Sequence, residues 1–213
     1  DAALTLGYAT KLSSDWGFGT NFRLIHSRLS GENIKVGAQE GKGVATSVSF
    51  DLGFMWRPER LMLPFIDEDI GGKISIGVNL SNIGPKIYYI NQSQADPIPT
   101  NFRFGFAYKV LDEEFNSLIY TLDFSKLLVS RKTTISGVDT TYSSKEWYQA
   151  IFTAWGDEPV SNELRDIVTS TGLEYWYGSP GDFLFALRTG FFYEDPAYGN
   201  RKFITFSVQI GRA

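Results

Sequence analysis

The sequence lacks cysteine, contains a single histidine and has no long hydrophobic run. The absence of cysteine excludes disulfide bonds and thiolate metal sites. Without a run of about 18 apolar residues no transmembrane helix is predicted, although transmembrane β-strands leave no such signal. The formal net charge is only −4, so the composition does not indicate a protein that binds nucleic acid.

A two-residue alternation of apolar with small or polar side chains is the strongest pattern in the chain. From Val44 to Trp56 every second residue is apolar apart from Thr46, whereas the residues between them are mainly small or polar. This period is that of a β-strand with one apolar face. Nine such strands are predicted, at residues 3–12, 16–29, 44–57, 73–82, 101–110, 117–125, 171–177, 183–192 and 202–212.

The strand lengths and the connections together predict an all-β fold in a membrane. Many strands reach about ten residues, the length of a tilted membrane-spanning strand, whereas soluble strands average about five or six. Short turns alternate with long loops, as in outer-membrane barrels. The short turns are 13–15, 111–116 and 178–182, and the long loops are 30–43, 84–100 and 130–170. We therefore predict one antiparallel, up-and-down transmembrane β-barrel domain covering residues 1–213.

Other features qualify this prediction. The segment 58–72 is long although it lies on the side of the short turns. Nine is an odd number, whereas single-chain bacterial barrels have even strand numbers, so we expect the chain to be a fragment of a longer barrel. A soluble sandwich or lipocalin-like barrel is the alternative fold. One short helix is predicted inside the longest loop, at 162–169, with Ser161 as its N-cap.

The positions of the aromatic residues indicate that the apolar faces of the strands contact lipid and not a protein core. Each Trp or Tyr lies in the part of its strand nearest a short turn, where aromatic side chains form a girdle at a membrane interface. The predicted girdle is Tyr8, Trp16, Trp56, Tyr108, Tyr120, Tyr175 and Tyr177.

The opposite faces of the strands carry small residues and single charges, which suit a narrow barrel lumen. The candidate lumen charges are Arg23, Asp51, Arg103, Asp123, Glu174 and Arg188. We hypothesise that the three arginines pair with the three carboxylates, so that the lumen is an ion-paired plug rather than an open pore.

Two groups of loop residues are candidates for docking a partner protein, because aromatic side chains anchor interfaces. The first group is Tyr88, Tyr89, Ile90, Pro97, Ile98 and Pro99, and the second is Trp147, Tyr148, Ile151, Phe152 and Trp155. The alternative is that the loops fold over the barrel mouth and pack on each other.

Catalytic, metal and cofactor sites are not predicted. His26 lies on an apolar face where no nucleophile is expected beside it, and hydrolase and phosphate-loop motifs are absent from the sequence. The acidic run Asp67, Glu68 and Asp69 lacks the distal glutamate of a calcium loop.

Six segments resemble the PorV (LptO) family of type IX secretion system outer-membrane proteins, which is similar to FadL-type barrels. They are residues 79–87, 98–103, 122–129, 172–177, 186–190 and 199–203. Each segment is short, but together they extend the resemblance from about residue 3 to residue 211 in the right order. The resemblance implies a barrel of fourteen strands, of which this chain supplies about nine.

The resemblance also implies a non-enzymatic role in the bacterial outer membrane. Such proteins associate with the translocon barrel and receive secreted cargo through its C-terminal signal domain. They then pass the cargo to a surface attachment complex that contains a sortase. Two alternatives stay open: a FadL-like transporter of hydrophobic small molecules, and a lipid A deacylase-type enzyme. The enzyme would need a nucleophile, a histidine and an acid at the barrel wall.

Overall fold

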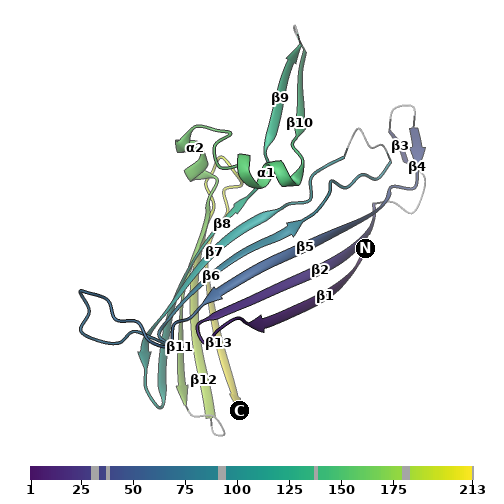
Figure 1. Cartoon of the computed structure of the whole chain (residues 1–213). Helices are drawn as coiled ribbons and strands as arrows, with labels where there is room; N and C mark the ends of the chain where they lie inside the picture. Colours follow the sequence, from purple (N-terminus) through teal and green to yellow (C-terminus); the bar gives the residue numbers. More distant parts are fainter. Residues whose placement is uncertain (30–33, 37–38, 91–94, 137–138, 179–182, 213) are drawn as a thin grey trace.

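Nine long antiparallel strands form one continuous curved sheet in the computed structural model (Figure 1). The structure describes residues 1–29, 34–36, 39–90, 95–136, 139–178 and 183–212. The strand order is β1-β2-β5-β6-β7-β8-β11-β12-β13, so neighbours in the sheet follow each other along the chain. The long strands are β1 (Ala2–Lys11), β2 (Trp16–Arg28), β5 (Val44–Trp56), β6 (Ile74–Ile83), β7 (Asn101–Asp112), β8 (Asn116–Leu127), β11 (Val168–Gly178), β12 (Phe183–Tyr193) and β13 (Lys202–Arg212).

The predicted all-β, up-and-down arrangement is confirmed. Each of the nine predicted strands is present, with both ends within three residues of the expected position. The alternation of short turns and long loops is also present, and the long segment between β5 and β6 stands on the side of the short turns (Figure 1). Of the predicted turn at 178–182, residues 179–182 lie outside the described part of the chain.

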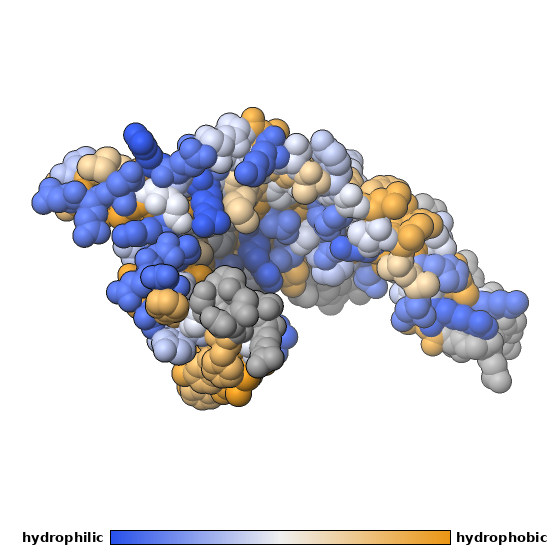
Figure 2. Space-filling model, turned by 90° about the horizontal axis from the view of Figure 1, so that it is seen from below, coloured by the Kyte–Doolittle hydropathy of each residue, from blue (hydrophilic) through white to orange (hydrophobic). Residues whose placement is uncertain are grey.

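The sheet does not close into a barrel within the described residues. Its edges are β1 and β13, and seven strands of alternating direction lie between them. Both edges therefore run in the same direction, and pairing them directly would be parallel. An up-and-down barrel containing this sheet needs an odd number of further strands between the two edges. The view from below shows the open, arched outline that results (Figure 2).

The pairing register keeps the apolar residues of successive strands on one face. Phe22 of β2 stands opposite Phe50 of β5, and Tyr108 of β7 stands opposite Tyr120 of β8. Because side chains alternate along each strand, this register sends the small and polar residues to the other face. We call these the apolar face and the polar face.

One irregularity interrupts the register between β5 and β6. The pairing shifts between Phe50 and Leu52, so that β6 carries an extra residue there. Asn82 takes up this extra residue with a positive φ of 57°, a conformation that asparagine tolerates better than most residues. The bulge turns the following chain toward the loop side of the sheet.

The long loops contain additional structure that the sequence analysis does not predict. Two hairpins, β3 (Ile34–Val36) with β4 (Gln39–Gly41) and β9 (Arg131–Ser136) with β10 (Asp139–Ser144), extend from the loop side. Helix α1 (Trp147–Thr153) follows β10. Both α1 and α2 (Val160–Arg165) lie at the loop-side end of the sheet, near the β9–β10 hairpin (Figure 1). In the described part of the chain, no helix is long and apolar enough to cross a membrane.

The predicted helix at 162–169 is present but displaced. Helix α2 covers Val160–Arg165, its N-cap position is Pro159, and no side chain caps it, so the predicted cap by Ser161 is wrong. Proline favours this position because its fixed φ suits the start of a helix. The helix ends early because β-branched Val168 and Thr169 pair with β8 instead.

The close approach of the chain after β6 to strand β5 gives a test of this packing. A Cβ atom at Gly84 would lie 2.3 Å from the backbone oxygen of Val48. We expect Gly84→Ala to destabilise the fold by about 1–3 kcal/mol, because the strand must shift to remove the clash. Unfolding in urea, followed by tryptophan fluorescence, measures the effect.

Gly156→Ala is the matched control, since nothing lies within 4 Å of a Cβ atom at that position. Its stability should change by less than about 0.5 kcal/mol. Equal stability of the two variants would contradict the packing of Gly84 on β5.

Candidate functional site

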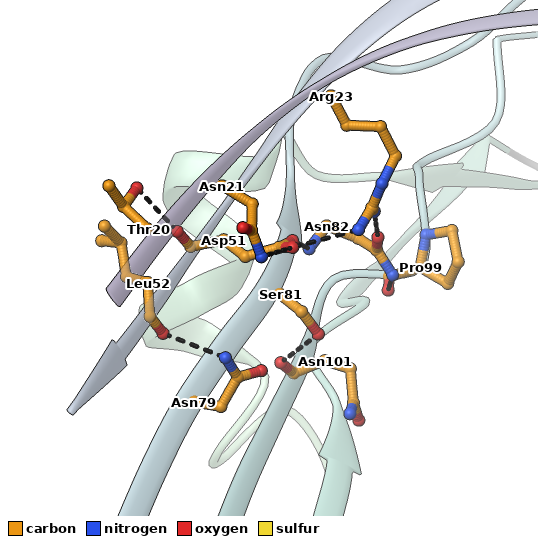
Figure 3. A network of polar contacts seen from close by, with 10 residues as sticks. All are labelled: Thr20, Asn21, Arg23, Asp51, Leu52, Asn79, Ser81, Asn82, Pro99 and Asn101. Carbon is orange, nitrogen blue, oxygen red and sulfur yellow. Dashed lines mark hydrogen bonds and ion pairs between the residues drawn. The ribbon is translucent and has the colours of Figure 1, made fainter. Parts of the chain in front are cut away.

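A polar network on the polar face surrounds the carboxylate of Asp51 (Figure 3). Arg23 Nη2 lies 3.1 Å from Asp51 Oδ2, and Asn21 Nδ2 donates to the same oxygen at 3.2 Å. The backbone N–H of Asn82 donates to Asp51 Oδ1 at 2.8 Å. The Asp51 side chain is only 8% exposed, and its two oxygens accept all three bonds, which compensates for the loss of water.

The same network holds the bulge of β6 in place. Arg23 Nη1 donates to Asn82 Oδ1 at 2.7 Å, Asn82 Nδ2 donates to the carbonyl of Pro99 at 3.2 Å, and Thr100 Oγ1 donates to the Asn82 carbonyl at 2.9 Å. The side chains of Asp51 and Asn82 therefore join strands β2, β5 and β6 to the chain that enters β7. The sequence analysis singles out Arg23 and Asp51 but misses Asn82, whose role depends on a bulge that alternation does not reveal.

Two of the three predicted lumen pairs are formed. Besides Arg23 with Asp51, Arg188 of β12 forms an ion pair with Glu174, its cross-strand neighbour on β11. The guanidinium of Arg188 also lies 5.0 Å from the ring centroid of Trp176 and donates to Gln209 Oε1 at 2.9 Å. These contacts stabilise the cation on the polar face.

The third predicted pair, Arg103 with Asp123, is not formed. Among the described residues no ion pair joins these two side chains, because the register places Arg103 opposite Ser125 and Asp123 opposite Gly105. A Cβ atom at Gly105 would lie 2.8 Å from Asp123 Oδ1, so the carboxylate lies over the glycine. Arg103 and Asp123 instead line an open hollow of about 890 Å³ on the polar face, whose other walls include Asn21, Asp51 and Asn79. The view from below shows hydrophilic residues on the inner side of the arched sheet (Figure 2).

The apolar face stays exposed over most of the sheet. Phe22, Phe54 and Leu187 lie on interior strands of the sheet, yet 50%, 46% and 43% of their surfaces are accessible. In the described part of the chain no second sheet covers this face. A monomeric soluble protein rarely exposes a continuous apolar surface of this extent.

The predicted girdle residues lie at the turn-side end of the apolar face. Trp16 and Trp56 stand opposite each other with ring centroids 6.3 Å apart. Tyr108 and Tyr120 also stand opposite each other. Tyr8 belongs to the same face of β1, and Tyr175 and Tyr177 to that of β11, because their cross-strand partners are on it. The register thus brings all seven to one band, and their role at a membrane interface stays a prediction.

The first candidate docking group is only partly accessible. Tyr88 is 50% exposed and Pro99 is exposed, whereas Tyr89 donates from its hydroxyl to Ser27 Oγ at 3.1 Å. Ile98 is buried at 7% exposure, so its predicted place in an exposed patch is wrong. The remaining members, Ile90 and Pro97, are half-buried.

The second candidate docking group belongs to α1 and the residues just after it. Its tryptophans pack on the apolar face of the sheet: Trp147 lies edge-on to Phe50 at 6.0 Å, and Trp155 lies edge-on to Phe102 at 5.2 Å, both between ring centroids. Ile151 is half-buried, whereas Tyr148 and Phe152 are exposed. The two tryptophans of this group therefore pack on the sheet, and the role of the group in docking stays a prediction. The spacing of Trp147, Ala150, Ile151 and Ala154 is the signal that could have revealed the helix.

Helix α2 is fastened to the sheet and to the loop between β12 and β13 by ion pairs. Lys126 of β8 is buried and its Nζ lies 2.8 Å from Glu163 Oε2 and 2.6 Å from Asp166 Oδ2. Lys126 stands opposite Phe102 and so belongs to the apolar face. Arg165 makes a two-pronged contact with Asp195, at 3.0 and 3.2 Å. The sequence analysis misses Lys126, because one charge at a strand end is not distinctive.

His26 does not belong to a recognisable catalytic set. Its Nδ1 lies 3.1 Å from Thr46 Oγ1, the side chain opposite it on β5. No carboxylate completes a triad with these two among the described residues, as an esterase mechanism of the triad type requires. The described residues also contain no group of three or more His, Asp or Glu side chains that could hold a metal ion.

The geometry defines a class of protein: an antiparallel, up-and-down sheet of the β-barrel type, with a polar inner network and an exposed apolar outer face. The comparison with protein families names it more closely. The model of the type IX secretion system protein PorV matches residues 1–134, and the chain therefore belongs to the PorV family. A comparison with curated proteins found no match. The family consists of secretion system components and is not a known family of enzymes.

The Asp51 network generates a stability prediction. Asp51→Ala leaves the partly buried guanidinium of Arg23 without its carboxylate and removes the acceptor that holds the Asn82 backbone. We expect a loss of about 2–4 kcal/mol, because removing one partner of a buried pair leaves the other uncompensated. Urea unfolding of the variant and the parent protein measures the difference.

Asp112→Ala is the control for this prediction, since Asp112 pairs with Lys109 at a half-exposed site near a turn. An exposed pair contributes about 0–1 kcal/mol. A loss at Asp51 no larger than the loss at Asp112 would contradict the role of the network.

The contact between Arg165 and Asp195 generates a pH prediction. The hydrogen bonds from Arg165, and next the backbone N–H of Ala197, hold the pKa of Asp195 below its usual value. A lowered pKa in the folded state means that the contact stabilises α2 fully above the ordinary aspartate pKa of about 4 and is lost as the pH falls through the lowered pKa. A spin label on Ser161→Cys should therefore gain mobility as the pH falls from about 7 to about 2.

Asp195→Asn in the same labelled protein should already show raised mobility at neutral pH, because the charge is absent throughout. If the label is equally immobile at both pH values in the parent protein, or if Asp195→Asn leaves it unchanged, the contact does not hold α2.

Proposed function

We propose that this chain is part of an outer-membrane β-barrel of the type IX secretion system, and that it acts by binding other proteins rather than by catalysis. The single observation that carries the membrane placement is the exposed apolar face of the sheet. Phe22 and Phe54 lie on interior strands of a continuous sheet and are about half exposed, which costs free energy in water but not against acyl chains. The position of the aromatic band at one end of this face supports the same placement.

The polar face then lines the barrel interior. Its two ion pairs, Arg23 with Asp51 and Arg188 with Glu174, tie neighbouring strands together rather than crossing an open space. They make the wall of the barrel rigid and polar. Membership of the type IX secretion family, rather than the lining of this face, favours a binding role over a FadL-like transport role.

The loop side is the place for partner recognition in this proposal. Long connections carrying secondary structure of their own gather there, whereas most connections on the other side are tight turns. Tyr88 offers an exposed aromatic side chain next to the ordered contact of Tyr89 with Ser27, and a rigidly supported aromatic is a good interface anchor. The partners that the family resemblance suggests are the translocon barrel, the C-terminal signal domain of secreted cargo and the sortase of the attachment complex.

Substitution of Tyr88 tests this proposal. In co-purification with cargo that carries the C-terminal signal, Tyr88→Ala should weaken binding about tenfold or more, because truncating an interface anchor costs at least about 1–2 kcal/mol. Affinity is measured by titrating labelled cargo domain onto the purified protein.

Phe115→Ala is the matched control. Phe115 is 49% exposed, as Tyr88 is 50% exposed, but it lies in the turn between β7 and β8 at the opposite end of the sheet. Equal effects of the two substitutions, or no binding of signal-bearing cargo by the parent protein, would refute docking on the loop side.

A further inference from the structure

Helix α1 and its C-cap bury two alanines against the sheet, whereas the helix exposes two large aromatic side chains. Ala150 and Ala154 are 4% and 2% exposed, whereas Phe152 is 79% exposed and Tyr148 is 52% exposed. Tyr148 and Phe152 are four residues apart, so they share one side of the helix. A helix on a soluble protein shows the reverse arrangement, with large apolar residues turned inward.

The helix lies across the apolar face of the sheet. Trp147 packs on Phe50 of β5 and Trp155 on Phe102 of β7, and both phenylalanines belong to the apolar face by register. Between them Ile83 of β6, also on this face, is only 2% exposed. The exposed side of α1 is therefore continuous with the apolar face and forms a second layer over it.

The contacts of α1 lie at a defined height above the aromatic band at the turn side. Phe50 lies six residues from Trp56 along β5, and Phe102 lies six residues from Tyr108 along β7. Six residues span about 20 Å of strand, or about 15 Å along the membrane normal at the usual tilt of about 40°. The apolar band of an outer-membrane barrel is about 25 Å tall, so α1 lies within its upper part.

Two polar side chains at the C-terminal end of α1 donate to carbonyls of the same segment. Trp155 Nε1 donates to the carbonyl of Ile151 at 2.9 Å, and Thr153 Oγ1 donates to the carbonyl of Gln149 at 3.0 Å. Internal hydrogen bonds of this kind are what a segment in contact with acyl chains requires. An interface that is filled by water before its partner arrives has no such requirement.

Helix α2 follows α1 after the exposed segment 156–159, and it too exposes apolar residues while it covers a cation. Val160 and Leu164 are 76% and 65% exposed. From its other side, Glu163 and Asp166 reach Lys126, which would otherwise point from the apolar face toward lipid. A bare lysine at mid-depth costs about 2–4 kcal/mol, decreasing toward the interface, and the two carboxylates neutralise it.

We propose that α1 and α2 form a membrane-embedded flap, whose exposed residues Tyr148, Phe152, Trp155, Val160 and Leu164 contact the acyl chains of the outer leaflet. This assignment rests on the proposed placement of the sheet in a membrane, and it gives the second docking group a lipid partner in place of a protein. The flap widens the apolar wall around β5 to β8 on the side of the long loops. Its function is to anchor the loop side of the barrel at a fixed depth.

The absence of cysteine allows a test with single labelled positions. Phe152→Cys carries a bimane fluorophore in the intact protein, reconstituted in phosphatidylcholine vesicles with and without brominated phosphatidylcholine. We expect strong quenching by the brominated lipid, and a quenching constant for aqueous iodide several-fold lower than at a water-exposed position. Val160→Cys repeats the measurement on α2, in case the label at Phe152 disturbs α1.

Two matched positions make the result decisive. Phe22→Cys lies on the bare apolar face opposite Phe50 and hence at the height of α1, and Ala197→Cys lies in the exposed loop between β12 and β13. If Phe152→Cys and Val160→Cys behave like Ala197→Cys while Phe22→Cys is quenched by lipid, the flap is refuted and the barrel stands. If Phe22→Cys is also quenched by iodide and not by lipid, the proposed membrane placement itself fails.

Discussion

The two-residue period of an antiparallel ladder, kept in register across nine strands, is the constraint from which the rest of the structure follows. In each pairing, such as Phe22 with Phe50, apolar residues of neighbouring strands stand opposite each other, so they lie on the same face of the sheet. A slip by one residue anywhere would turn the apolar residues of the remaining strands toward the polar network. The register therefore determines which residues form the apolar face of the sheet and which form the polar face.

The ladder shifts at two places, between β5 and β6 and between β7 and β8, and the polar network is concentrated at the first of them. The bulge at Asn82 frees a backbone N–H that no longer pairs across the ladder, and the carboxylate of Asp51 accepts it. Because the same carboxylate binds Arg23, a local defect in the sheet becomes a junction of three strands. Bulges commonly redirect a chain in this way at the rim of a barrel, and here the chain beyond Asn82 leads into the loop that carries Tyr88.

The sequence predicts the elements that depend on local pattern, and fails where contacts between distant segments decide. Alternation locates all nine long strands, since each strand carries its own signal. It also selects Arg23, Asp51, Glu174 and Arg188 as facing one side, but it cannot show that Arg103 and Asp123 stand in different rows of the ladder. Helix α2 ends at Arg165 because Val168 pairs with β8, about forty residues earlier in the chain. No window of sequence around α2 contains that information.

Lys126 lies on the apolar face, which is the face proposed to contact lipid. A lysine on the apolar face contradicts a lipid-facing wall only if it is bare, and its burial beneath Glu163 and Asp166 removes the contradiction. The two carboxylates come from a helix whose own exposed residues, Val160 and Leu164, are apolar. The exposed charge of this helix, Arg165, is paired with Asp195. Charge neutralisation beneath and apolar residues above are together what a segment between a barrel wall and acyl chains requires.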